Sequence, residues 1–180
     1  MRVFLNPGHA PNGEPDPGAC GWGIRECDVA KNVADLVAGY LTDAGVEVAG
    51  NLQSDSLEEV VDVSNESEAD IFISIHCNAC NGNARGTEVW YYHRSANGEL
   101  LADCIRHQIV DALGTADRGS KGAKPGVNGL YVLNNTGATA VLVELAFIDN
   151  EADAQLLCSQ QDEFARAIAR GVTDYEQEVF

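Results

Sequence analysis

Three residues that can bind a metal ion or transfer a proton stand at the edges of apolar segments in this chain of 180 residues. His9 follows the first apolar segment, His76 directly follows the run 71–75, and Glu144 interrupts the run 141–147. Open α/β sheets bind ligands at the carboxyl ends of their strands, so these positions predict one shared site. Taken singly, each histidine could be solvated or bonded to a loop carbonyl, and the glutamate could face solvent or form a structural salt bridge.

Glu26 adds a fourth candidate to this set. A glutamate in the first turn of a helix is commonly an acid that stabilises the helix dipole. Catalytic zinc sites, however, take three protein ligands from histidine and glutamate and leave a fourth position for water. His9, Glu26 and His76 would form such a set, with Glu144 left as the proton-transferring acid. A metal bound by two imidazoles and one carboxylate keeps a net positive charge, so its water can ionise near neutral pH.

The cysteines offer a competing metal or redox chemistry. Cys77 and Cys80 have the two-residue spacing of a zinc knuckle or a redox pair, but no second pair at a matching spacing follows them. Six cysteines in 180 residues are also far fewer than a small disulfide scaffold uses. We therefore expect mostly reduced thiols that pack as small apolar side chains.

Strands and amphipathic helices alternate along the chain and must position these residues. The patterns predict strands over 2–5, 46–49, 71–75, 87–92, 130–133 and 139–145, and helices over about 29–41, 56–69, 100–113 and from 150 onward. The glycine-rich segment 114–129 fits neither pattern and is expected to be a flexible loop. The alternation predicts an α/β protein with a mostly parallel sheet of about six strands, flanked by helices on both faces in a three-layer αβα arrangement of the phosphorylase/hydrolase-like type.

Composition excludes several classes of function. The chain has 28 acidic residues against 11 lysines and arginines, a formal charge of −17, which disfavours nucleic acid and anionic membrane surfaces as partners. No apolar stretch is long enough to predict membrane insertion or a secretory signal peptide. We expect residues 1–180 to form a single domain that acts as a monomer. Three of the scarce cations, Arg118, Lys121 and Lys124, gather in the segment expected to be a loop.

Several blocks of sequence, taken together, resemble the zinc-dependent N-acetylmuramoyl-L-alanine amidases of the amidase 3 family. The blocks are residues 4–9 (FLNPGH), 24–26 (IRE), 69–79 (ADIFISIHCNA), 86–92 (GTEVWYY), 117–119 (DRG), 131–133 (YVL) and 140–150 (AVLVELAFIDN). The resemblance runs over almost the whole chain. It departs from the family pattern at residues 51–54, where members usually carry an arginine, and at Ala146, which replaces a usual glycine.

The resemblance implies one zinc ion held by His9, Glu26 and His76, with Glu144 as the catalytic carboxylate. The reaction it implies is hydrolysis of the amide between the lactyl group of muramic acid and the L-alanine of the stem peptide in peptidoglycan. Stem peptides carry free carboxylates, so the cations in segment 114–129 are candidate substrate-binding residues, although a solvated basic loop explains them equally well.

Two alternatives stay open beside this reading. The chain could be a non-catalytic peptidoglycan-binding module that keeps the fold, or a zinc peptidase or carboxypeptidase that cuts within the stem peptide. The resemblance places its action at the bacterial cell wall or periplasm. Without an export signal, the chain is expected to be a phage-type endolysin or a fragment of an exported autolysin. It also lacks the inserted regulatory helix of some periplasmic members, which predicts a site that is open without an activator.

Overall fold

The computed structural model describes residues 1–179, whose central feature is a six-stranded sheet in the order β4-β1-β5-β8-β6-β7. The strands are β1 (Arg2–Pro7), β4 (Glu47–Asn51), β5 (Ile71–Asn78), β6 (Thr87–Tyr92), β7 (Asp117–Ala123) and β8 (Thr139–Phe147). Every neighbouring pair is parallel except β6 and β8. The central strands β1, β5 and β8 are apolar on both faces, which places them in the middle of a covered sheet.

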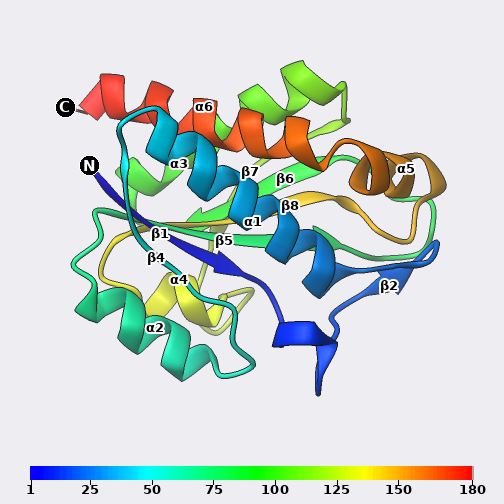
Figure 1. Cartoon of the computed structure of the whole chain (residues 1–180), viewed down its shortest axis with the longest axis horizontal. Coiled ribbons are helices and arrows are strands. Elements are labelled where there is room, and N and C mark those ends of the chain that lie inside the picture. The colour runs from blue at the N-terminus through cyan, green and yellow to red at the C-terminus, as the bar shows by residue number, and fades with distance from the viewer. Residues whose placement is uncertain (180) are drawn as a thin grey trace.

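Helices cover both faces of the sheet (Figure 1), so the expected three-layer α/β arrangement is confirmed. One face carries α1 (Glu26–Asp43), α3 (Ala96–Leu113), α5 (Glu151–Ser159) and α6 (Gln161–Val179). The other carries α2 (Leu57–Glu66) and the short α4 (Tyr131–Asn135). Each face has its own cluster of buried apolar side chains. Within residues 1–179, no helix combines the length and the apolar character needed to cross a membrane.

Two expectations from the sequence are wrong in the same part of the chain. Residues 130–133 do not form a strand, because Tyr131–Asn135 is the helix α4, with Val132 and Leu133 buried against the sheet. The sixth strand is instead β7, which lies in the segment expected to be a flexible loop. A short apolar run does not distinguish a strand from a buried helix. Conversely, β7 is polar because it is an edge strand that pairs only with β6, so cross-strand pairing overrides its weak intrinsic preference.

The segment between β1 and α1 contains the remaining short elements of the fold. It contains a 3-10 turn, η1 (Pro11–Gly13), and a small antiparallel hairpin of β2 (Cys20–Gly21) and β3 (Ile24–Arg25). The hairpin leads directly into the first residue of α1. Since β1, β5 and β8 run parallel, their carboxyl ends meet at one edge of the sheet, where this segment also lies.

Candidate metal centre

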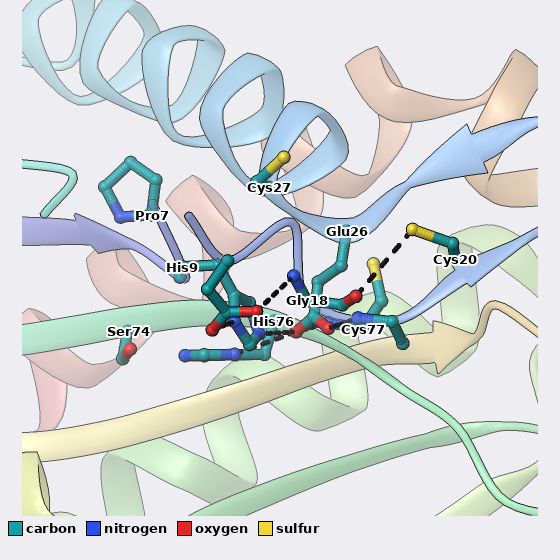
Figure 2. Close-up of polar contacts among 12 residues, drawn as sticks. Pro7, His9, Gly18, Cys20, Glu26, Cys27, Ser74, His76 and Cys77 are labelled. Carbon is teal, nitrogen blue, oxygen red and sulfur yellow. Dashed lines mark hydrogen bonds and ion pairs between the residues drawn. The ribbon is translucent and has the colours of Figure 1, made fainter. Parts of the chain in front are cut away.

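The carboxylate of Glu26 contacts both His9, two residues after β1, and His76, inside β5 (Figure 2). Its Oε1 is 3.0 Å from Nε2 of His9 and 2.9 Å from Nδ1 of His76. One potential ligand atom from each of the three side chains falls within 4.8 Å of the others. Residues widely separated in the sequence therefore converge on one point, as the sequence predicted.

Backbone amides fix the orientation of the Glu26 carboxylate. The amide of Cys77 donates to Oε1 over 3.0 Å, and the amide of Ala19 donates to Oε2 over 2.8 Å. Glu26 is only 4% exposed. Because Glu26 is the first residue of α1 and the hairpin folds back beside it, its carboxylate is held by donors that precede it and by the end of β5.

Two glycines leave the space that the imidazoles occupy. A β-carbon added at Gly8 would lie 2.3 Å from the ring of His76. One added at Gly18 would lie 2.5 Å from His9 and 2.6 Å from Glu26. Any side chain at these two positions would displace a candidate ligand, so the glycines are part of the construction of the site.

The three side chains strongly perturb one another's protonation. Burial disfavours the ionised form of Glu26, but hydrogen bonds from His76 and His9 outweigh it and hold the pKa of Glu26 far below its usual range. The contact with Glu26 raises the pKa of His9 to about 9, against burial and with help from Asp16. Oδ2 of Asp16 is 2.8 Å from Nδ1 of His9, on the side of the ring away from Glu26. Sequence reasoning missed Asp16, which lies in the loop between β1 and the hairpin and has no distinguishing spacing.

This donor set could hold a metal ion. Two imidazoles and a carboxylate are ligands typical of catalytic zinc sites, and a carboxylate behind the outer nitrogen of a ligating histidine is a recurrent supporting contact. The cysteines take no part: within residues 1–179 the one candidate group of metal-binding side chains is His9, Glu26 and His76. Cys77 is buried in the apolar core and Cys80 is exposed.

Glu144 lies beside this group on β8, directly across from His76 in the pairing of β5 with β8. Its Oε2 is buried and accepts no hydrogen bond from residues 1–179. Burial raises the pKa of Glu144 to about 7; the charge of His76 opposes this, whereas Glu26 and Glu88 add to it. A buried carboxylate oxygen without a partner is costly unless a proton, a water or a cation satisfies it.

Glu88 is a second buried carboxylate that sequence reasoning missed. It is 3% exposed and lies opposite Glu144 in the antiparallel pair of β6 and β8. Four donors surround it: the side chains of Asn78, Trp90, Arg118 and Lys121. The sequence does show a charged residue within the predicted strand 87–92, which could have marked Glu88. Its partners Arg118 and Lys121 could not be identified, because β7 is not recognisable as a strand from the sequence.

Arg118, Lys121 and Lys124 do not share one environment, and they do not lie on a flexible loop. Arg118 and Lys121 project from β7 onto Glu88, with Nε of Arg118 2.7 Å from Oε2. Lys124 lies just beyond β7, is exposed, and makes no side-chain hydrogen bond or ion pair within residues 1–179. The structure thus brings two of the three cations to the neighbourhood of Glu144.

A small apolar pocket adjoins the histidines on the α2 and α4 side of the sheet. Its volume is about 140 Å³, and its lining includes Leu57, Tyr131 and Leu142 beside the rings of His9 and His76. An uncharged group of a ligand could enter it while the ligand contacts the candidate metal-binding side chains. The site therefore has an apolar side and, across β8, a side that carries Arg118 and Lys121.

Known proteins are similar to this chain in both sequence and fold. The family model Amidase_3, described as N-acetylmuramoyl-L-alanine amidase, matches residues 3–174. N-acetylmuramoyl-L-alanine amidase LytC of Bacillus subtilis is 35% identical over 181 residues, covering 96% of this chain and 35% of LytC. The uncharacterized protein YqiI of the same organism is 34% identical over 96% of this chain and 84% of its own length. The endolysin of Bacillus phage SPP1 is 36% identical over 94% of this chain and 62% of the endolysin.

Solved structures agree with these matches. An N-acetylmuramoyl-L-alanine amidase from Clostridium difficile 630 superposes with a TM-score of 0.88 at 28% identity, covering 99% of this chain and 98% of that one. AmiC2 of Nostoc punctiforme gives a TM-score of 0.87 at 31% identity, with 98% and 97% covered. The chain spans about a third of the length of LytC and of a cell wall amidase from Bacillus anthracis.

Proposed function

Because the chain belongs to the Amidase_3 family of N-acetylmuramoyl-L-alanine amidases, we propose that it hydrolyses the amide between the lactyl group of N-acetylmuramic acid and the L-alanine of the stem peptide. The observation that carries this proposal is the convergence of His9, Glu26 and His76 with the unpartnered carboxylate of Glu144 alongside. Three metal-binding side chains and one free acid are what metal-assisted hydrolysis of an amide requires.

Zinc is the metal that this donor set fits, held by His9, Glu26 and His76. When bound, it would supply a Lewis acid for the amide carbonyl and lower the pKa of a water. The other residues prepare this site. Asp16 holds the outer nitrogen of His9, and the amides of Ala19 and Cys77 orient the carboxylate of Glu26.

Glu144 is the proposed proton carrier. In its ionised form, Oε2 accepts a proton from the attacking water as the water oxygen forms a bond to the amide carbon. The protonated acid then delivers that proton to the nitrogen as the carbon–nitrogen bond breaks. The products are the free amino group of L-alanine and the carboxylic acid of the lactyl group, which keeps the second proton of the water and loses it to solvent. A pKa of about 7 suits both steps, because the group can accept and release a proton near neutral pH.

Arg118 and Lys121 are the proposed contacts for the carboxylates of the stem peptide. Together with Glu88 they leave one net positive charge beside the catalytic acid. Their side chains are about one third exposed, so they are accessible to a ligand. Lys124 stands apart from this group and would contribute only if the peptide extends past the end of β7.

We place the action of the chain at the bacterial cell wall, with peptidoglycan as its partner. All four proposed site residues come from one chain, so a monomer is sufficient for activity. Its relatives include the amidase LytC and a phage endolysin, which supports either an autolytic or a lysin role.

Purified peptidoglycan incubated with the zinc-loaded protein tests this function. We expect release of new amino-terminal L-alanine, identified by mass spectrometry, and a loss of activity of about 10²–10⁴-fold in Glu144→Gln. Glu66→Gln, an exposed acid on α2 without a hydrogen-bonding partner in residues 1–179, is the matched control and should retain full activity. Cleavage inside the stem peptide would identify a peptidase, and binding without product release would identify a binding module.

A further inference from the structure

The turn between β2 and β3 carries a tryptophan where its backbone favours a different residue. The two turn residues, Trp22 and Gly23, both have positive φ, 52° and 82°. Two-residue turns of this kind strongly prefer asparagine followed by glycine. Trp22 is also 62% exposed, so the indole gains little from burial. A residue that is unfavourable for its backbone conformation, and whose side chain gains little stability from burial, is expected mainly at functional positions.

The indole is nevertheless held in place. Nε1 of Trp22 donates to the carbonyl oxygen of Asp149 over 3.4 Å. The side chain of Asp149 accepts from the amides of Cys80 and Gly82, each over 2.9 Å. The hairpin packs closely, since a β-carbon at Gly21 would lie 2.4 Å from the carbonyl oxygen of Ile148. Hairpin, loop 80–85 and the turn before α5 thus form one cross-linked surface, beside α5 in Figure 1.

This surface contains an open groove of about 450 Å³. Its lining includes Trp22, Arg85, Asn150, Glu151 and Gln155. With one cation and one anion the lining is formally neutral, in a chain whose net charge is −17. Arg85 and Glu151 are both exposed, and neither forms an ion pair within residues 1–179, so both can bond to a ligand.

An exposed indole face ringed by amide and charged side chains matches the chemistry of a pyranose sugar. The apolar C–H face of the ring packs on the indole, and hydroxyl and acetamido groups bond to the surrounding polar side chains. The stem peptide is a poorer fit, because Glu151 in the same lining offsets the attraction of Arg85 for its carboxylates. Those carboxylates have Arg118 and Lys121 available instead.

We propose that this Trp22 groove binds the N-acetylated glycan strand of peptidoglycan, at sugars other than the one bearing the cleaved amide; the identity of the polymer rests on the proposed function. The hairpin enters α1 four residues after Trp22, at Glu26 of the proposed metal site. Occupation of the groove therefore anchors a glycan strand next to the metal centre, and supplies affinity for the wall that the negative net charge does not.

Binding of a tetramer of N-acetylglucosamine, measured by isothermal titration calorimetry on the full chain, tests the groove without using the amide reaction. We expect Trp22→Asn to raise the dissociation constant by about tenfold and Trp22→Tyr to change it by about threefold or less. Asparagine suits the positive φ, so Trp22→Asn should unfold at the same temperature as the unsubstituted chain or higher. No binding by the unsubstituted chain, or equal binding by Trp22→Asn, would overturn the proposal.

A comparison of two substrates separates glycan binding from damage to the metal site. Trp22→Asn should raise KM for wall glycan strands but leave kcat/KM unchanged for a short muramoyl peptide with no further sugars. An equal loss on both substrates would mean that Trp22 only supports the metal centre, and would contradict the proposal. If neither substrate is hydrolysed by the unsubstituted chain, the amidase function fails, while the tetramer titration still decides whether the groove binds sugar.

Discussion

Glu88 and Glu144 lie directly opposite each other on the antiparallel strands β6 and β8, and their environments shift their pKa values in opposite directions. Both are penalised by burial. Hydrogen bonds from Lys121 and Arg118 overcome that penalty at Glu88 and lower its pKa, whereas Oε2 of Glu144 has no donor within residues 1–179 and the pKa of Glu144 rises to about 7. Opposite pKa shifts of two neighbouring carboxylates support the proposed role of Glu144 as the proton carrier, with Glu88 as a fixed anion.

The pH dependence of hydrolysis should follow from this pair. Glu144 accepts a proton only when ionised, so kcat/KM should rise with pH through its pKa. Glu88→Gln removes a negative neighbour and frees two cations, and both changes favour ionised Glu144. The acidic limb of the pH profile, measured on peptidoglycan fragments, should therefore move to lower pH. A limb that stays in place would show that Glu88 does not influence the catalytic acid.

Metal binding should release a proton from His9. Contact with Glu26 raises the pKa of His9 to about 9, yet a histidine must be neutral to bind a metal. At pH 7.5, zinc binding should release about one proton from this residue, and the release should fade above pH 9. Calorimetric titrations in buffers of different ionisation enthalpy measure the total number of protons released, to which the metal-bound water also contributes, so variants with an altered His9 environment isolate its share. Asp16→Asn removes a second anion beside the ring and should reduce the release; an unchanged value would contradict the role of Asp16.

Gly8 should be essential for metal binding although it has no side chain. In Gly8→Ala the new methyl carbon would lie 2.3 Å from the nearest ring atom of His76, so the methyl group and the ring would overlap. The displaced imidazole should weaken zinc affinity by at least about tenfold, measured by competition with a chelating dye. Gly39→Ala is the matched control, because Gly39 lies in α1 with nothing within 4 Å of the added group. It should leave zinc affinity unchanged and stabilise the fold by up to about 1 kcal/mol.

Lys121 and Lys124, both in segment 114–129, should differ in their effect on substrate binding. Lys121→Met removes one of the two cations beside Glu88, and should raise KM several-fold for muramoyl peptides that carry free carboxylates. Lys124→Met should have a smaller effect, because Lys124 lies outside this group. Substrates whose peptide carboxylates are amidated provide the control and should not distinguish Lys121→Met from the unsubstituted chain. Equal effects of both substitutions would favour a diffuse electrostatic role.

The sequence alone predicts most of the fold and the group of side chains that could hold a metal ion. Strands apolar on both faces, such as 71–75, can be stable only in the middle of a covered sheet, and polar residues at the ends of such strands must face the edge where ligands bind. On this basis, His9, His76 and Glu144 are selected as candidates. Glu26 is a candidate because it would complete a set of three metal ligands. These inferences are possible because the order of apolar and polar residues within each short segment is enough to predict which side chains are buried.

The tertiary structure decided which strands are neighbours. Residues 117–123 are a strand because β6 supplies their hydrogen bonds, and residues 131–135 are a helix because one side of that segment packs on the sheet. Only that pairing sets Glu88 opposite Glu144, and only the folded hairpin holds Trp22 against Asp149. Such contacts join residues far apart in the chain, and their energies depend on the partner, so no local pattern encodes them.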